Sequence, residues 1–334
     1  MRPPHGRARL ALAAVLLGLP ALAACTVDPP SGGSGGAAPS DQPFTGPMRI
    51  AVITHGDDGG FWSIVRRGAE DAAATLPEVT LDYQGASGDA KLQSDMINAA
   101  LNQGANALAV SAPDVGAIGS ALDRAEAAGV PIITLNSGSE LLDQRDGVIT
   151  HVGQSEQDAG RAAGEALAEQ GATTVLCVLH EQNNIGLQQR CDGAGEGLGG
   201  GPGALVKVQV TGTRDLTSTA REIGAAMDAQ SPDAVLTLDP DIAMAALREV
   251  TDRGAALATF DLSPEVLDQV AAGAISFAVD QQPYLQGYLP VVFLELAVRN
   301  RNEVGAGRLV ATGPALVTEE NAAAIAALSQ EGTR

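Results

Sequence analysis

The chain has 334 residues, of which 45% are hydrophobic and only 3% aromatic, and its formal net charge is −20. A surface this acidic repels phosphate backbones, which argues against nucleic-acid binding. The length exceeds what one hydrophobic core usually organises, so we expect two lobes.

The N-terminus has the features of an export signal. Three arginines and no acidic residue precede an apolar run over 10–22. This run is shorter than the roughly 20 residues that a membrane span needs. It ends in Leu22-Ala23-Ala24-Cys25, which resembles a bacterial lipobox, whose cysteine is lipidated after cleavage. An ordinary signal peptidase site with an incidental cysteine is the alternative. We expect a signal peptide over 1–24 and anchoring to the outer face of the cytoplasmic membrane through Cys25.

The segment that follows differs in composition from the rest of the chain. Thirteen of the 22 residues over 26–47 are Gly, Pro or Ser. Such a stretch buries no core and behaves as a flexible spacer. We therefore expect a tether over 25–47 and a folded domain from residue 48 onward.

Beyond the tether, short apolar runs alternate with segments of helical spacing. In the first half, strands are expected at 49–54, 79–83, 107–110, 131–135 and 148–152, and helices at 61–76, 90–102 and 117–128. In the second half, strands are expected at 174–179, 204–210, 234–238, 257–260 and 276–279, and helices at 156–169, 185–197, 218–230, 242–253 and 264–272. Strands joined by crossover helices form parallel sheets covered on both faces. The sequence predicts an α/β fold of two doubly wound lobes.

Two cysteines remain once Cys25 is assigned to the anchor. Cys177 and Cys191 would lie in an oxidising compartment after export, where disulfides persist. We expect a disulfide between them, and two separate buried thiols are the alternative.

Polar residues end several of the predicted strands: Asn136, His180, Asp239, Asp261 and Asp280-Gln281. In open parallel sheets, ligands bind beyond the carboxyl ends of the strands. Helix capping is the alternative role for such residues. Ser263-Pro264 already supplies a cap and a first helical proline after Asp261, and Asp241 is expected to cap its own helix and leave Asp239 free. We therefore expect both Asp239 and Asp261 to contact ligand.

The pair Phe61-Trp62 follows two glycines at the first predicted strand-to-helix turn. The chain has nine aromatic residues and one tryptophan, so adjacent aromatics are unexpected here. Two neighbours at a helix start cannot both face the core, so we expect one to face a cleft. There an aromatic ring would pack against the C–H face of a sugar. Ordinary packing of both rings is the alternative.

Nine short segments, taken in order and spacing, carry a family resemblance. They are 49–54, 59–62, 67–70, 104–107, 129–134, 152–154, 189–193, 260–261 and 280–284. Together they resemble type I periplasmic sugar-binding proteins such as the ribose-, galactose- and fructose-binding proteins. The resemblance implies two lobes that close by a hinge motion, with three crossovers near 152–154, 280–283 and 308–312. One lobe is expected to hold 48–152 plus 283–309, and the other 153–282 plus 310–334.

The resemblance also implies a ligand site. The matching positions are Phe61 and Trp62 for ring stacking, and Asn136, Arg190, Asp239, Asp261 and Gln281 for hydrogen bonds, with Asp58, Ser137 and Asn184 as additional candidates. Arg190 is expected to balance the charges of Asp239 and Asp261. Ribose binders have aspartate and arginine where this chain has Asn136-Ser137, and Thr213 stands near the position of their second-lobe aromatic. These departures favour a hexose or another polyol over ribose.

The expected function is that of a solute-binding lipoprotein. It would capture a sugar or polyol, with a hexose favoured, and deliver it to the permease and ATPase of an ATP-binding-cassette (ABC) importer. We expect a monomer that is not an enzyme and has no catalytic residue, cofactor or metal. Two alternatives remain: a partner that presents a cyclitol or signalling furanose to a membrane receptor, and a carbohydrate-active enzyme. The enzyme is disfavoured because Arg190 would hold both carboxylates ionised, which leaves no general acid. A repressor of the related fold would need a DNA-binding segment before residue 49, where the signal and tether lie.

Overall fold

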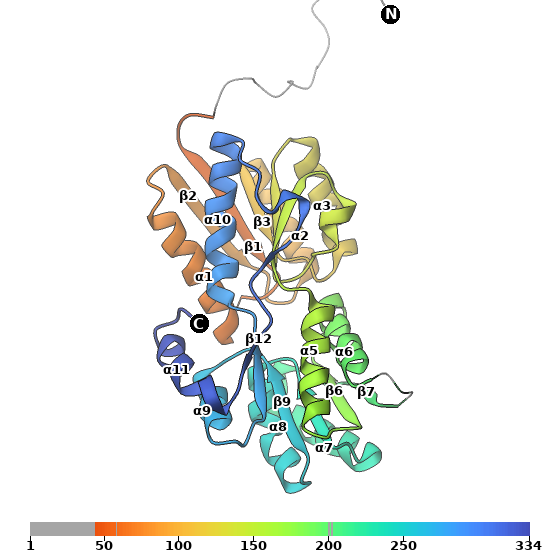
Figure 1. Cartoon of the computed structure of the whole chain (residues 1–334). Helices are drawn as coiled ribbons and strands as arrows, with labels where there is room; N and C mark the ends of the chain where they lie inside the picture. Colours follow the sequence, from red (N-terminus) through yellow and green to blue (C-terminus); the bar gives the residue numbers. More distant parts are fainter. Residues whose placement is uncertain (1–43, 58, 200, 202) are drawn as a thin grey trace, which may run out of the picture. The chain divides into compact units, whose positions relative to one another are not determined.

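The computed structural model describes residues 44–334 apart from residues 58, 200 and 202. The predicted signal peptide, Cys25, most of the tether and Asp58 therefore lie outside the described residues. Within the described part, two six-stranded sheets are each flanked by helices (Figure 1). The predicted α/β class with two doubly wound lobes is confirmed.

The first lobe is built from β1 (Met48–Thr54), α1 (Gly59–Ala74), β2 (Val79–Gly85), α2 (Ala90–Asn102), β3 (Ala107–Val110), α3 (Val115–Ala127), β4 (Ile132–Leu135), α4 (Leu141–Gln144) and β5 (Val148–Gly153). The second lobe follows with α5 (Glu156–Glu169), β6 (Val175–Leu179), α6 (Ile185–Gly197), β7 (Leu205–Gln209), α7 (Leu216–Gln230), β8 (Ala234–Thr237), α8 (Pro240–Asp252), β9 (Ala256–Phe260), α9 (Pro264–Ala271) and β10 (Phe277–Asp280). The chain ends with α10 (Pro283–Asn300), β11 (Val310–Ala311), β12 (Ala315–Val317) and α11 (Glu319–Gln330).

The strand order of each sheet locates the site. The first sheet runs β11-β5-β4-β3-β1-β2, and the second runs β12-β10-β9-β8-β6-β7. The strand order reverses at β1 in the first sheet and at β6 in the second, where the chain winds first to one side and then to the other. Ligands bind outside the carboxyl ends of strands at such switch points. His55, which follows β1, and His180, which follows β6, therefore stand at the two positions where a ligand is expected.

The chain passes between the lobes after β5, after β10 and between β11 and β12. Val310 and Ala311 pair with the end of β5 in the first sheet. Of the last two strands, β11 lies in the first sheet and β12 joins the second sheet, where it runs antiparallel to β10. The first lobe thus extends to Ala311, two residues beyond the predicted boundary at 309, because backbone pairing with β5 continues that far.

The folded part begins before residue 48. Phe44 packs against the core cluster of the first lobe. The Arg299 guanidinium lies 6.0 Å from the centre of its ring, and the Gly46 carbonyl accepts a hydrogen bond from Arg299 Nη1 at 3.4 Å. Composition predicted a tether that continues to residue 47. The folded part begins earlier, because the Phe44 ring packs against the apolar core of the first lobe.

The sequence predicts no element after residue 279, whereas the structure has α10, β11, β12 and α11 there. Proline disfavours a helix interior, and α10 carries Pro290 inside it. The helix packs so closely on α1 that a Cβ at Gly287 would lie 1.8 Å from the Val65 carbonyl oxygen. Among the helices that the structure describes, none has the length and apolarity that crossing a bilayer requires.

A disulfide joins Cys177 of β6 to Cys191 of α6, with the two Cα atoms 5.8 Å apart. Both residues are fully buried in the second lobe. A crosslink that closes a loop of this length stabilises a protein by about 3 kcal/mol, mainly by restricting the unfolded chain. It also holds α6, the helix that carries Arg190, against the sheet.

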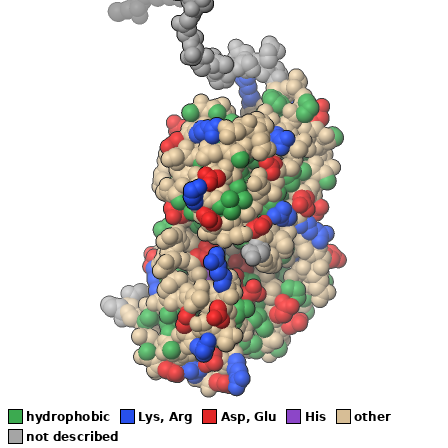
Figure 2. Space-filling view, turned by 180° about the vertical axis from the view of Figure 1, so that it is seen from behind, with side chains coloured by type: hydrophobic (Ala, Val, Ile, Leu, Met, Phe, Trp, Pro, Cys, Tyr) green, Lys and Arg blue, Asp and Glu red, His purple; other side chains and the backbone are tan. Residues whose placement is uncertain are grey.

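Charges on the surface are mixed. On the face shown in Figure 2, Lys and Arg side chains lie among Asp and Glu and form no continuous basic stripe. Several arginines are paired, for example Arg253 with Asp228 and Glu249, and Arg145 with Asp123. Such exposed pairs contribute little to stability, because solvent screens their charges. On this face we find no electrostatic footprint for nucleic acid.

Candidate functional site

The site is centred on a buried ion pair between the first turn of α5 and the middle of α6. The Arg190 side chain donates from Nε to Glu156 Oε2 at 2.5 Å and from Nη2 to Glu156 Oε1 at 3.1 Å. Only 4% of Arg190 and 3% of Glu156 is exposed. Burial alone would lower the pKa of Arg190, but the Glu156 carboxylate raises it above its usual value. A two-point contact of this kind holds a guanidinium in one orientation.

Glycines let the two helices approach closely enough for this pair to form. A Cβ at Gly160 of α5 would lie 2.1 Å from the carbonyl oxygen of Arg190, and one at Gly193 of α6 would lie 2.0 Å from that of Gln157. The face of the guanidinium lies over the Phe260 ring, with Cζ 4.6 Å from its centre. Arg190 is thus held at its edge by a carboxylate and on its face by an aromatic ring.

Glu156 is a functional candidate that sequence reasoning missed. Arg190 was expected to balance Asp239 and Asp261. Its nearest contact with Asp261, from Nη1 to Oδ2, is 3.9 Å long, whereas Glu156 is at hydrogen-bond distance. The expected pairing with Asp261 is thus present only as this longer ion pair, and the hydrogen bonds of the arginine go to a third carboxylate, Glu156. The sequence offers no signal for it, since a glutamate in a first helical turn is ordinary.

Asp261 follows β9 in a left-handed conformation, with φ of 65°. Its Oδ1 accepts a hydrogen bond from Gln281 Nε2 at 2.7 Å. Burial raises the pKa of Asp261 to about 7, with a smaller increase from Asp239 and Glu156, although Arg190 and Gln281 act to lower it. The cap of α9 is Ser263, whose Oγ accepts from Val266 N at 3.1 Å, as predicted. Asp261 is therefore not a cap.

Asp239 is a helix cap, in contrast to the expectation. Its Oδ1 accepts from Ile242 N at 3.0 Å at the start of α8. The prediction that Asp241 would cap this helix and leave Asp239 free is wrong. Pro240 occupies the first helical position, so the preceding residue has the geometry of the cap. A capping carboxylate still keeps lone pairs for other donors, so Asp239 stays a weaker ligand candidate.

The two lobes meet at Asn136 and Gln281. Asn136 follows β4 with φ of 60° and donates from Nδ2 to Gln281 Oε1 at 3.2 Å, across from the end of β10. Its Oδ1 accepts from Ser137 Oγ at 3.1 Å. Gln281 in turn reaches Asp261, so a chain of hydrogen bonds runs from the first lobe to the second. Asn136, Ser137 and Gln281 are all buried.

The aromatic pair lies in the first turn of α1. Phe61 and Trp62 form an edge-to-face contact with centroids 4.9 Å apart. Trp62 also meets the His55 ring edge-on at 4.7 Å, and a Cβ at Gly56 would lie 1.9 Å from Trp62 Nε1. Both aromatic rings are half-buried against the first-lobe cluster. Each ring therefore packs against the core and also keeps a partly exposed surface. Packing and ligand stacking, the two roles that the sequence suggested, are thus compatible.

His55 is a second candidate that the sequence did not single out. Its Nδ1 lies 2.8 Å from Ser111 Oγ, and its backbone N–H donates to the same hydroxyl at 2.7 Å. Burial lowers the pKa of His55, which keeps the ring neutral. The charges of Glu181, His180 and Arg190 in the second lobe are close enough to act on it. Its position directly after β1, where the strand order reverses, is the signal that could have found it.

The opposite rim of the site belongs to the second lobe. Asn184 caps α6 through Oδ1, which accepts from Gly186 N at 3.0 Å, and donates from Nδ2 to Glu181 Oε2 at 2.8 Å. A Cβ at Gly186 would be 3.6 Å from Ser137 Oγ of the first lobe. Ser137 and Asn184 therefore lie near one another, and the third additional candidate, Asp58, is not described.

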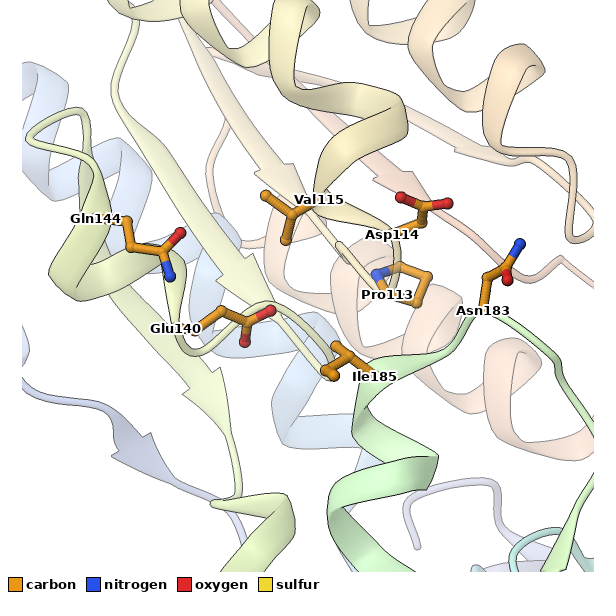
Figure 3. A pocket seen from close by; sticks show the side chains of 7 residues that line it. All are labelled: Pro113, Asp114, Val115, Glu140, Gln144, Asn183 and Ile185. Carbon is orange, nitrogen blue, oxygen red and sulfur yellow. The ribbon is translucent and has the colours of Figure 1, made fainter.

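A surface pocket of about 470 Å³ lies where the lobes meet, lined by Pro113, Asp114, Val115, Glu140, Gln144, Asn183 and Ile185 (Figure 3). The Ile185 N–H donates to the Pro113 carbonyl at 3.4 Å between the lobes. None of the predicted ligand residues lines this pocket. The candidate ligand site is instead the polar cluster around Arg190, where a few convergent polar groups are desolvated, because such clusters fix the orientation of small ligands. In the part of the chain that the structure describes, no group of three His, Cys, Asp or Glu side chains has the geometry of a metal site.

Comparison with known proteins agrees with this geometry. Residues 50–302 match the periplasmic binding protein domain family. The chain belongs to the periplasmic binding protein family. It is 37% identical to a carbohydrate transporter from Acidothermus cellulolyticus solved in complex with myo-inositol. That comparison covers 86% of this chain and all of the other, with a TM-score of 0.80.

Two more distant relatives extend the comparison of this binding protein. It is 25% identical to the xylose/arabinose-binding protein XylF of Sulfolobus acidocaldarius over 269 residues, which are 74% of this chain and 65% of that protein. It also shares its fold with an ABC transporter solute-binding protein from Bacillus halodurans with bound myo-inositol. That match has 20% identity and a TM-score of 0.73, and it covers 84% of this chain and 98% of the other. The predicted resemblance to type I periplasmic sugar-binding proteins is confirmed.

Proposed function

We propose that this binding protein captures a neutral polyhydroxylated ring, with myo-inositol as the leading candidate. The observation that carries the proposal is the buried cluster of Arg190, Asp261, Gln281 and Asn136. It offers donors and acceptors from both lobes without an unpaired cation. An anionic ligand would need a free cation, whereas the hydroxyl groups of a neutral ligand can both donate and accept. The bound myo-inositol of the 37% identical relative supports the same class.

A cyclitol fits better than the hexose that the sequence favoured. Every ring carbon of myo-inositol carries a hydroxyl group, so its whole edge needs polar partners. One of its faces presents mainly C–H groups, which pack on one aromatic ring. Phe61 and Trp62 supply aromatic surface in the first lobe, and no aromatic stands at Thr213 in the second. One-sided stacking with polar groups around the edge is the environment that such a ring requires.

Thermal denaturation with candidate ligands tests the proposal. At a hundred times its dissociation constant, a ligand adds about 2.7 kcal/mol to the free energy of unfolding. We expect myo-inositol to raise the melting temperature, and glucose, galactose, xylose and ribose to raise it less. A larger increase in melting temperature with a hexose would indicate that the ligand is a sugar rather than a cyclitol. No shift with any neutral polyol would contradict it.

We also propose that lipidated Cys25 holds the protein at the outer face of the cytoplasmic membrane, where it delivers its ligand to an ABC permease. The lipobox and tether support the anchor, and family membership supports the importer. In cells that carry Cys25→Ala, the protein should leave the membrane fraction and uptake of labelled myo-inositol should fall. Retention in the membrane fraction would contradict the anchor, and undiminished uptake would contradict the role of the anchor in import.

A further inference from the structure

Glu156 lies at the junction of three features: the first crossover, the ligand cluster and the close contact between α5 and α6. It is the first residue of α5, three residues after the end of β5. Its Oε2 accepts from Arg190 Nε at 2.5 Å and from Gln154 Nε2 at 3.0 Å. Its Oε1 accepts from Arg190 Nη2 at 3.1 Å. This carboxylate therefore receives three donors while almost wholly buried.

We propose that Glu156 is the positioning residue of this site: it occupies two of the three Arg190 nitrogens and so holds the arginine at the longer ion-pair distance from Asp261 rather than at hydrogen-bond distance. This inference rests on the proposed function, because it assigns Asp261 and the remaining Arg190 nitrogen to the ligand. Glu156 itself acts through Arg190.

The charges around Asp261 support this division. Arg190 faces it from α6, Glu156 from α5 and Asp239 from the start of α8, while Gln281 contributes a neutral donor. Among the described residues, Arg190 forms ion pairs with both Glu156 and Asp261. The cation lies 2.5 Å from Glu156 but 3.9 Å from Asp261, and the strong charge-assisted bond forms only at the shorter distance. Asp261, whose side chain is only 12% exposed, is left with the more distant of the two contacts of this cation.

The consequence for ligand recognition concerns the proton of Asp261. Burial raises its pKa to about 7, so near neutral pH the carboxyl group is partly protonated. A carboxylic acid donates one hydrogen bond and accepts others, whereas a carboxylate only accepts. Asp261 can therefore match a ligand hydroxyl in either role. By engaging Arg190, Glu156 sets which role prevails.

The test measures the titration of Asp261 in the absence of ligand. Carbon-13 NMR of aspartate-labelled protein, with the signal assigned through Asp261→Asn, should give a midpoint near 7 in the wild type. In Glu156→Gln, the Glu156 charge that raises the pKa of Asp261 is removed and the freed arginine turns to Asp261, so we expect the midpoint to fall by about one pH unit or more. The matched control is Glu196→Gln, which removes an exposed carboxylate that contacts Arg161 between the same two helices. It should leave the midpoint unchanged.

A second variant covers the risk that Glu156→Gln does not fold. Glu156→Asp keeps the charge but shortens the reach, so the midpoint should fall by less, and affinity for myo-inositol should be partly retained. In Glu156→Gln that affinity should fall at least tenfold. An unmoved Asp261 midpoint in folded variants would overturn the inference, as would loss of folding in both. If the Asp261 midpoint moves in Glu156→Gln but the wild-type protein does not bind myo-inositol, the proposed ligand alone would be contradicted.

Discussion

Replacing Arg190 by methionine should abolish binding of myo-inositol and lower the free energy of unfolding by about 3–5 kcal/mol. The variant leaves the Glu156 carboxylate buried without its partner, and an uncompensated buried charge is strongly destabilising. It also removes the only guanidinium that lies within 4 Å of Asp261 among the described residues. Urea unfolding measures the loss of stability, and isothermal titration calorimetry measures the loss of binding.

The matched control is Arg161→Met, on the same pair of helices. The Arg161 side chain is 42% exposed and contacts Asp158 and Glu196 at the surface, so its loss should leave both stability and binding nearly unchanged. The double variant Glu156→Leu/Arg190→Met should recover most of the stability, because a buried ion pair can be replaced by apolar side chains at little cost. It should not recover binding. Wild-type affinity in Arg190→Met would show that the arginine does not contact ligand.

Asp261→Asn should lower the affinity for myo-inositol at least tenfold, because a hydrogen bond to a charged group contributes about 1.5–3 kcal/mol. Asparagine keeps the shape of the side chain and tolerates the left-handed backbone at this position. The fold should therefore be retained. Calorimetric titration at pH 8, where the wild-type carboxyl group is mostly ionised, measures the loss.

The same variant should stabilise the unliganded protein at high pH. The pKa of Asp261 is about 7 in the folded state and close to 3.8 when unfolded, so between these values the folded state binds more protons. Wild-type stability accordingly falls as the pH rises from about 4 to about 7. Asp261→Asn removes this loss and should raise the free energy of unfolding at pH 8 by as much as about 4 kcal/mol, with little effect near pH 4.

The control for this pH dependence is Asp268→Asn, which changes an exposed aspartate on α9. Its stability should follow that of the wild type across the whole range. If Asp261→Asn and the wild type lost stability in parallel between pH 4 and 8, Asp261 would not carry the buried charge inferred for it. A ligand group that costs stability in the empty protein is typical of sites selected for function.

The local sequence was enough to predict the alternation of strands and helices. Helices over 90–102, 156–169 and 185–197 have the predicted bounds, because apolar side chains recur at helical spacing there. α10 was not predicted. It continues through Pro290, which disfavours a helix interior, and it packs closely against α1. Hydrophobic periodicity indicates which face of a segment is buried. It does not predict segments whose secondary structure depends on packing against other elements.

By itself the sequence determined the two-lobed α/β fold and the polar strand ends. Asn136, Asp261 and Gln281 could be selected because the carboxyl ends of parallel strands converge at one edge. Only the tertiary structure decided which charges pair. Glu156 and Arg190 are 34 residues apart, and they meet because glycines bring α5 and α6 into contact. Asp239 caps α8. Arg190 donates its hydrogen bonds to Glu156 and is farther from Asp261, the carboxylate that it was expected to balance. Charge pairing depends on distances of a few ångströms between separate elements, and such distances follow from packing rather than from any local pattern.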